Sequence, residues 1–257
     1  MASSQTTVDD LKARLIGQPL MLRGFWMDDK LNFDQDGEPM ANYKTGPFSE
    51  SGFDAQKVKL HGDKLVIEGQ RVALAFVKDG TAQRLPMTHG TYGRSIPDDV
   101  TITIDGQGNP DFSKELDTIF AAHLDDILPS LPDYWQLIAR RILRAEGHAA
   151  HAPKDPAKAS VMHIAGNVTR PVILTKVEPE FTDVARQHKF SGDCMLYLWV
   201  GPDGVPSHIA IVRPVGLGLD ENAVAALSKY KFSPATLGGK PVTVDLYVDV
   251  GFRIFWP

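Results

Sequence analysis

Short runs of β-forming residues, separated by polar turns, fill the first hundred positions of the chain. Each run is too short for a helix and is bounded by glycine or polar residues, a pattern typical of strands. The strands predicted in this way are 19–26, 30–34, 57–61, 64–68, 71–77 and 100–105. The dipeptides Gly62-Asp63 and Gly69-Gln70 are typical of tight turns, so residues 57–77 are predicted to form three antiparallel strands. We therefore expect an antiparallel β-sandwich or barrel-like domain over residues 1–110.

The pattern changes to helical spacing over residues 111–145, where we expect a pair of helices. The first helix is predicted to begin at Ser113 as its N-cap. Its buried face is predicted to carry Leu116, Ile119, Phe120, His123, Leu124 and Ile127. The second helix covers residues 133–145 and turns inward Trp135, Ile138, Ile142 and Leu143.

Residues 146–160 are rich in Ala, Pro and Lys and show no periodicity, so they are predicted to be a linker that contains the domain boundary. The remaining chain, residues 161–257, is predicted as a second domain of antiparallel sheet plus helices. Its strands are expected at 193–200, 207–215 and 242–255, and its helices at 181–187 and about 219–229. Apolar residues alternate strictly with polar ones along the last strand, which indicates a half-buried antiparallel strand. The predicted fold class is therefore α+β.

The loop before the second of these helices resembles a nucleotide-binding loop, because Gly216 and Gly218 lie between a strand and a helix. A dinucleotide loop needs a third glycine, and Glu221 occupies that place. Asp220 and Glu221 would also repel a bound phosphate. We therefore expect a structural turn and no nucleotide cofactor.

A set of motifs in a fixed order spans about residues 168–255. The motifs are Pro179 and Phe181, Ala185 and Arg186, Gly192, the turn Asp203-Gly204-Val205, Leu219 with Asp220 and Ala223, Phe232 with Pro234 and Ala235, the run Gly239 to Val242, and Phe252. This order resembles the C-terminal domain of TonB-family proteins. The resemblance implies the fold of that domain for residues 161–257.

The resemblance also implies a function, because the C-terminal domain of this family adds an extended peptide, the TonB box of outer-membrane receptors, to its sheet edge as a strand. The corresponding edge here is the last strand, and its solvent face carries the candidate peptide-binding residues Thr243, Asp245, Tyr247, Asp249 and Arg253. The alternative is that these side chains only solvate the sheet. The family's Pro-Tyr pair is replaced by Pro179-Glu180-Phe181, which puts any contact of that tyrosine in doubt.

A row of large side chains, Met195, Tyr197 and Trp199, lies on the face of its strand opposite to the predicted core. Such a row is costly to leave in water and is a candidate interface. Packing within the chain is favoured over an external partner. Because TonB-like domains can exchange strands, homodimerisation stays open.

Composition narrows the classes of function. Hydrophobic residues make up 43% and charged residues 23% of the 257 positions, and the formal net charge is −5. This is a globular composition without a basic surface for nucleic acid. Cys194 is the single cysteine, so an intrachain disulfide is excluded. No apolar run approaches the roughly 18 residues that span a bilayer, and residues 1–15 lack a signal core.

Given the resemblance, we expect a periplasmic location with a signal or anchor outside this sequence. The membrane anchor and the Pro-rich spacer of TonB proteins are not found in this sequence, so energy transduction is not carried over. The predicted partner is a peptide of an outer-membrane receptor or another envelope protein.

Motifs for catalysis or metal binding are weak. Glu146, His148 and His151 lie in the predicted linker, where rigid metal ligation is not expected. The acidic run 34–38 misses the spacing of a calcium loop. No catalytic motif occurs, Cys194 is expected to be a buried hydrophobe, and no metal, cofactor or catalytic residue is predicted.

The sequence therefore predicts a non-enzymatic cell-envelope protein that binds extended peptides by strand addition and is related to TonB-dependent transport. The alternative is a ligand-binding or catalytic N-terminal β-domain that uses the TonB-like part for docking. The pocket of such a domain would be lined by Trp26, Asp28, Asp29, His89, Tyr92 and Arg94.

Overall fold

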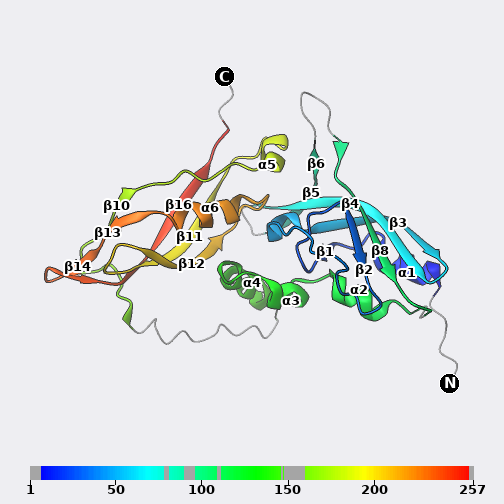
Figure 1. The fold of residues 1–257 in the computed structure, drawn as a ribbon. Helices are drawn as coiled ribbons and strands as arrows, with labels where there is room; N and C mark the ends of the chain where they lie inside the picture. The colour runs from blue at the N-terminus through cyan, green and yellow to red at the C-terminus, as the bar shows by residue number, and fades with distance from the viewer. Residues whose placement is uncertain are drawn as a thin grey trace. The chain divides into compact units, whose positions relative to one another are not determined.

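The computed structural model describes residues 7–77, 81–89, 96–108, 111–145, 147 and 160–254 (Figure 1). The chain divides into two compact units. The N-terminal unit contains residues up to 75 together with 82–130, and the C-terminal unit contains 76–81 and 131–257. Both units combine sheet with helices, so the predicted α+β class is confirmed.

A seven-stranded sheet that curls into a half-barrel forms the N-terminal unit. Its strands are β1 (Leu20–Leu22), β2 (Lys30–Phe33), β3 (Gly52–His61), β4 (Lys64–Phe76), β5 (Ala82–Pro86), β8 (Asp99–Asp105) and β9 (Phe120–Ala121). The order is β2-β8-β4-β3-β1-β9, and β5 also pairs with β4. β6 (Thr88–His89) and β7 (Ile96–Pro97) form a separate ribbon. We predicted a wholly antiparallel sheet, but β2 and β8 run parallel.

The prediction of three strands over 57–77 is wrong. One turn lies at residues 62–63, and β4 then continues through Gly69, which pairs with Ala55 on one side and Val100 on the other. A Cβ at Gly69 would lie 2.4 Å from the Asp54 carbonyl oxygen and 2.5 Å from the Phe53 ring. The glycine therefore marks close packing inside a strand and not a turn.

The first predicted helix is also interrupted. α2 (Ser113–Ile119) ends where Phe120 adopts an extended conformation and enters β9, opposite Leu22 of β1. The chain then forms α3 (Leu124–Ile127) and a 3₁₀ turn, η2 (Leu128–Ser130). His123 is exposed at the N-cap of α3 and not on a core face, and Ser113 is the first residue of α2 and not its cap. Pairing with the sheet overrides the local helical pattern.

The core of the N-terminal unit lies inside the curled sheet and is covered by α1 (Val8–Leu15) and α2. The helix α1 begins with a capping box in which Thr7 and Asp10 bond reciprocally. A 3₁₀ turn, η1 (Phe48–Glu50), precedes β3. The most buried core side chains include Leu15, Leu22, Leu31, Phe33, Phe53, Leu65, Ile67, Ile102, Ile104, Phe112 and Ile119.

The C-terminal unit is built on a three-stranded antiparallel sheet in the order β12-β11-β16. Its elements are α4 (Asp133–Ala145), β10 (Val172–Thr175), α5 (Asp183–Gln187), β11 (Gly192–Val200), β12 (Pro206–Arg213), α6 (Leu219–Leu227), β13 (Lys231–Ser233), β14 (Ala235–Leu237), β15 (Lys240–Val242) and β16 (Val244–Phe252). Two small ribbons, β10-β13 and β14-β15, complete it. α6 packs on β11 and β12, and α4 packs on β12.

The predicted helices and long strands of this unit are found, but the short strands β10, β13 and β14 were not predicted, and there are differences in extent and grouping. The last strand is shorter than 242–255, because Val242 ends β15 and the long strand begins at Val244. α4 has the predicted bounds but belongs to the C-terminal unit, whereas α2 and α3 belong to the N-terminal unit. Of the predicted linker 146–160, only Gly147 and Ser160 are described. Within the described parts of the chain, no helix is long and apolar enough to cross a membrane.

Candidate functional site

β16 is an edge strand of the C-terminal sheet. It pairs along its whole length with β11, from Gly192 opposite Phe252 to Val200 opposite Val244. Within the sheet no strand follows β16 on its other side, as far as the described residues show. The peptide groups on that side are therefore available to pair with another chain.

The backbone groups that face the open side can be identified from one contact. The Met162 N–H donates to the Thr243 carbonyl (2.9 Å), and the Asp245 N–H donates to the Met162 carbonyl (3.2 Å). Alternate residues of a strand direct their peptide groups to the same side. Tyr247, Asp249 and Gly251 therefore direct their N–H and C=O groups outward, in the same direction as Asp245.

Met162 forms this contact as a single parallel bridge opposite Val244. His163 strengthens it, because its Nδ1 lies 2.8 Å from Asp245 Oδ1. The Met162 residue is 38% exposed and the His163 side chain 80% exposed. A short segment of the same chain thus occupies the beginning of the edge, which the sequence pattern did not reveal.

The candidate peptide-binding residues lie on one face of the sheet, as their alternation predicted. Thr243 and Arg253 flank β16 at its two ends, and Asp245, Tyr247 and Asp249 lie within it. Tyr247 is the most exposed of the large side chains there, at 62%. Its role in binding stays a prediction, because the described contacts are compatible with a solvated face.

Met195, Tyr197 and Trp199 lie on this same face, opposite Asp249, Tyr247 and Asp245. Trp199 is buried, stacks on His208 at 3.7 Å between ring centroids, and donates from Nε1 to the Tyr197 hydroxyl (2.8 Å). The Tyr197 hydroxyl donates to Asp245 Oδ2 (3.2 Å), and its ring lies 5.3 Å from the Tyr247 ring. The chain itself covers most of Trp199, while Met195 and Tyr197 are half-buried.

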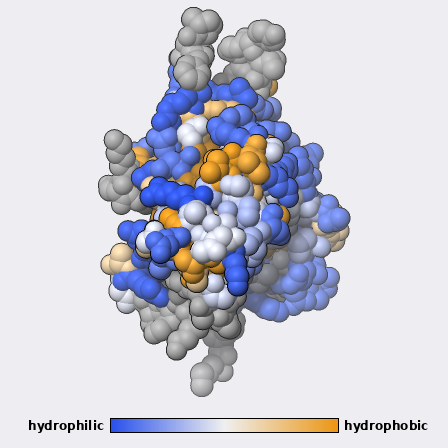
Figure 2. Space-filling view, turned by 90° about the vertical axis from the view of Figure 1, so that its left-hand side faces the viewer, coloured by the Kyte–Doolittle hydropathy of each residue, from blue (hydrophilic) through white to orange (hydrophobic). Residues whose placement is uncertain are grey.

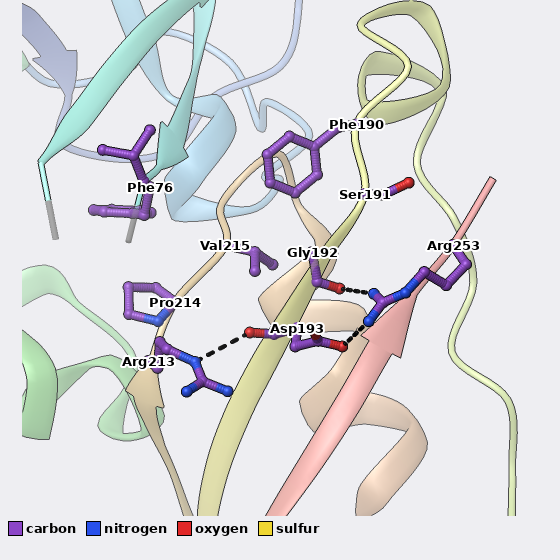
Figure 3. A pocket seen from close by; sticks show the side chains of 10 residues that line it. Phe76, Phe190, Ser191, Gly192, Asp193, Arg213, Pro214, Val215 and Arg253 are labelled. Carbon is purple, nitrogen blue, oxygen red and sulfur yellow. Dashed lines mark hydrogen bonds and ion pairs between the residues drawn. The ribbon is translucent and has the colours of Figure 1, made fainter. Parts of the chain in front are cut away.

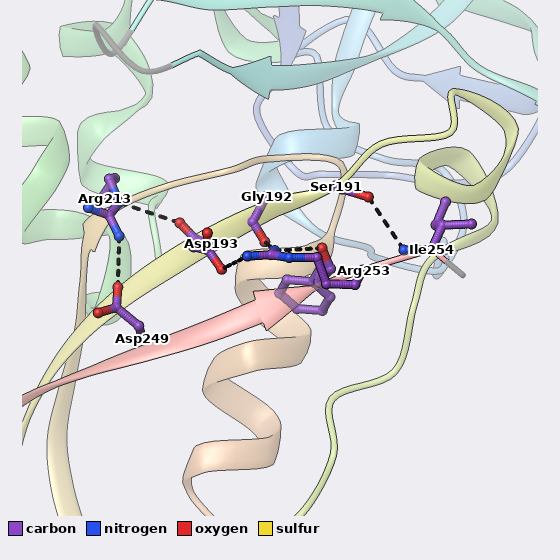
Figure 4. Close-up of polar contacts among 8 residues, drawn as sticks. Ser191, Gly192, Asp193, Arg213, Asp249, Arg253 and Ile254 are labelled. Carbon is purple, nitrogen blue, oxygen red and sulfur yellow. Dashed lines mark hydrogen bonds and ion pairs between the residues drawn. The ribbon is translucent and has the colours of Figure 1, made fainter. Parts of the chain in front are cut away.

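Ion pairs link all three strands at the other end of this face (Figure 4). Arg213 of β12 donates to Asp249 Oδ1 of β16 (2.7 Å) and to the Asp193 carbonyl of β11. Arg253 donates to Asp193 Oδ1 (2.6 Å) and to the Gly192 carbonyl (2.9 Å). These side chains are about half exposed, so each pair adds little stability but holds the charges in register.

A cleft of about 750 Å³ lies beside these arginines within the C-terminal unit (Figure 3). Its apolar wall is formed by Phe76, Val77, Phe190, Pro214 and Val215. Its polar rim is formed by Ser191, Gly192, Asp193, Arg213 and Arg253. Both guanidinium groups already bind carboxylates, so their positive charges are balanced and do not favour an anion in the cleft.

Exposed aliphatic residues gather at the end of the C-terminal unit that carries β10 and β14, where Figure 2 shows apolar surface among polar residues. The residues with the largest exposure there are Val172 (60%), Ile173 (45%) and Leu174 (67%). They follow one another in β10, whose described partner strand is β13. Met162 and Leu237 are also exposed.

The glycine loop between β12 and α6 has a structural role, as predicted. Gly216, Leu217 and Gly218 all have positive φ, from 57° to 82°. The carboxylate of Asp220 is fully buried and accepts hydrogen bonds from the Val215 N–H (2.9 Å) and the Gly216 N–H (2.5 Å). These two amides are therefore occupied by a side chain of the protein and not available to a phosphate.

Burial raises the pKa of Asp220 to about 7, and the negative charge of Glu221 also raises it. Asp220 accepts hydrogen bonds from Cys194 and the two amides, and these bonds lower its pKa. Cys194 itself is buried in β11, and burial together with the charge of Asp220 raises the pKa of its thiol. A thiol with a raised pKa in a closed environment is unreactive. This agrees with the prediction of a buried hydrophobe.

The structure describes four of the six residues that were candidates for an N-terminal pocket, namely Trp26, Asp28, Asp29 and His89. In the N-terminal unit, the carbonyls of Trp26 and Asp28 accept hydrogen bonds from the fully buried Arg71, which also binds Asp98. The Asp29 carbonyl accepts from the Thr101 N–H, and His89 is exposed at the end of β6. Tyr92, Arg94, Glu146, His148 and His151 lie outside the described residues.

Metal-binding groups are likewise not found where the structure is described. The acidic run 34–38 is a turn in which Asp34 Oδ1 accepts from the N–H groups of Asp36 and Glu38. No cluster of three His, Cys, Asp or Glu side chains that could hold a metal occurs within the described residues.

The C-terminal region is similar to known proteins. Residues 177–254 match the family described as Gram-negative bacterial TonB protein C-terminal. Protein TonB of Vibrio cholerae serotype O1 (strain ATCC 39315 / El Tor Inaba N16961) is 26% identical over 110 residues, which are 40% of this chain and 43% of that protein. The chain thus spans less than half of the length of this relative. Residues 177–254 form a TonB-like C-terminal domain, as the motifs predicted.

Among solved structures, the chain is similar to the solution NMR structure of the Pseudomonas aeruginosa TonB CTD. The identity is 16%, and the similarity covers 37% of this chain and 97% of that chain, with a TM-score of 0.27.

Proposed function

We propose that the C-terminal unit binds an extended segment of another envelope protein by adding it as a strand to the open edge of β16. The observation that carries this proposal is the outward direction of the peptide groups of Tyr247, Asp249 and Gly251. Those groups are set in register by the pairing of β16 with β11. A strand that pairs with them needs no particular side chains for its main-chain bonds, which suits recognition of varied partners.

The family match supports the cellular setting of this function. The match links the domain to TonB-dependent transport. We place the protein in the periplasm and take outer-membrane receptors as the proposed partners that present the extended segment. We propose a binding role and not catalysis. Cys194 and Asp220 are buried groups with raised pKa values, and both serve the fold of the β12–α6 region, because they contact each other and Asp220 binds the Val215 and Gly216 amides.

The affinity expected from such an edge is modest. Each main-chain hydrogen bond contributes on the order of 0.5–1.5 kcal/mol net, and ordering a flexible peptide opposes binding. Side chains on the two faces of the added strand must therefore supply part of the affinity.

The test is a titration of the full chain, labelled at backbone amides, with extended peptides from the N-termini of outer-membrane receptors. Chemical-shift changes concentrated at residues 244–252 are expected. Tyr247→Pro removes one outward N–H, and proline is tolerated at the open side of an edge strand. It is expected to weaken binding clearly, by the loss of this bond and by the bulk of the proline ring, while the rest of the spectrum stays that of the folded chain.

The matched control is Tyr247→Ala, which removes the same ring but keeps the N–H. If the main chain carries binding, the proline variant is weaker than the alanine variant. Equal affinities of the two variants, both folded, would contradict strand addition at this register. Shifts confined to another surface would contradict the proposed edge altogether.

A further inference from the structure

The open part of the β16 edge begins after Asp245. The Thr243 carbonyl and the Asp245 N–H already bond to Met162, so these two outward groups are used by the chain itself. The run from Tyr247 to Gly251 is free of such a partner among the described contacts. An added strand therefore has Tyr247 as its first fully available partner, which fixes where its side chains can lie.

The side chains of an added strand must alternate in step with those of β16. A residue placed opposite Tyr247 lies on the outer face, because directly opposed residues of paired strands share a face. Its two neighbours along the peptide then lie on the inner face, beside Leu246 and Val248. The two faces present different chemistry.

The outer face is acidic around Tyr247. Asp245 and Asp249 precede and follow it on the same face, two positions away in each direction. Asp249 is 58% exposed and uses Oδ1 for Arg213. The side chain of Asp245 is only 10% exposed and is bound by His163 and Tyr197. A residue opposite Tyr247 therefore lies over an exposed aromatic ring and beside the exposed carboxylate of Asp249, while the carboxylate of Asp245 is largely covered.

The nearest cations are already paired, and Arg213 uses only one oxygen of Asp249, which leaves Oδ2 of that carboxylate for an added strand. Arg213 reaches Asp249 from β12, on the far side of β11, and the guanidinium group of Arg253 is bound to Asp193. On the inner face, Leu246 and Val248 are only half-buried although they are apolar. Apolar neighbours in an added strand would cover them and remove that area from water.

We propose that the segment bound at this edge carries a basic residue opposite Tyr247, with an apolar residue on each side of it. This inference rests on the proposed strand addition and adds the class of partner. The aliphatic stem of a lysine or arginine covers the Tyr247 ring, and its charged head lies beside Asp249.

The test compares three peptides that are identical except at the residue opposite Tyr247, which is Lys, Met or Glu. Affinity for the full chain is measured by fluorescence anisotropy at low ionic strength. Opposite charges and a cation over a ring each contribute modestly at an exposed site, so Lys is expected to bind about three- to tenfold more tightly than Glu, with Met between them. Added salt is expected to reduce this difference.

The charge of Asp249 is tested with Asp249→Lys, which is expected to invert the order so that the Glu peptide binds more tightly. Asp203→Lys is the matched control. It makes the same change of net charge in the exposed turn between β11 and β12, and it is expected to keep the preference for Lys.

Two failures are distinguishable. If all three peptides bind with equal affinity and shift residues 244–252, strand addition stands and the basic preference is wrong. If none of them binds, and receptor N-termini do not bind either, the proposed function itself is wrong. A preference for Lys that is the same in the wild type and in Asp249→Lys would also overturn the inference.

Discussion

Replacement of Asp220 by alanine is expected to loosen the turn between β12 and α6 and to destabilise the C-terminal unit. The carboxylate accepts hydrogen bonds from the Val215 and Gly216 amides, and all three residues are buried. Alanine leaves both N–H groups without this acceptor. Each buried donor left in that state costs roughly 1–3 kcal/mol, so the expected loss for two donors is about 2–6 kcal/mol of unfolding free energy.

The magnitude is large relative to the whole stability of a domain, which is on the order of 5–15 kcal/mol. Urea unfolding is followed by near-ultraviolet circular dichroism, and amide hydrogen exchange at Val215 and Gly216 reports the local opening. The control is Asp203→Ala, which removes an acceptor for the Val205 N–H in an exposed turn. Its expected cost is below about 0.5 kcal/mol, as for most surface substitutions.

The difference in stability between the wild type and Asp220→Ala is expected to depend on pH. Burial raises the pKa of Asp220 from 3.8 to about 7 in the folded chain. Between these values the folded state binds the proton more tightly, so wild-type stability falls as pH rises from about 4 to 7. The alanine variant lacks this group, and the gap between the two proteins is expected to be wider at pH 5 than at pH 8.

The reasoning would be refuted by an Asp220→Ala variant that loses no more stability than Asp203→Ala and keeps the Val215 and Gly216 amides protected. A gap that widens with rising pH would contradict the raised pKa. It would show that the hydrogen bonds to the carboxylate outweigh its burial.

Three further predictions concern single positions. Gly204→Ala is expected to lower the melting temperature by several degrees, because φ is +73° and the new Cβ would lie 1.9 Å from the Phe232 carbonyl oxygen; an unchanged melting temperature in a thermal scan would contradict this. Met162→Pro removes the N–H that bonds to the Thr243 carbonyl. If the segment around Met162 competes with the peptide for the edge, this variant is expected to bind the peptide about two- to fivefold more tightly. Weaker binding in a calorimetric titration would show that the segment supports the site. Cys194 is buried, so it is expected to react with a thiol reagent such as 5,5′-dithiobis(2-nitrobenzoic acid) only after unfolding. Rapid reaction of the native chain would contradict this prediction.

Local patterns were sufficient for the main helices and the long strands of the C-terminal unit. The helix over 133–145 and the alternation of the last strand follow from side-chain periodicity, which each segment carries in its own residues. The same alternation placed Asp245, Tyr247 and Asp249 on one face. The glycine loop was identified as structural by its residues, because Glu221 occupies the place of the third glycine and two adjacent acids would repel a phosphate.

The same kind of pattern failed where distant segments meet. Gly69 is typical of a turn by composition, but in the structure it lies within a strand because the Phe53 ring packs against it. Phe120 fits a helical face, but its backbone pairs with Leu22 and ends the helix. Arg71, which lies among apolar residues in β4, is fully buried and satisfied by Asp98 and by backbone carbonyls. None of these partners is near in sequence.

The candidate site shows the same division. The sequence by itself determined which residues alternate along β16 and that its motifs are those of a TonB-like domain. Only the tertiary structure decided which peptide groups face outward, because that depends on the register with β11 and on the bond to Met162. Periodicity is a property of one segment, whereas an open edge is a property of what does and does not pack beside it.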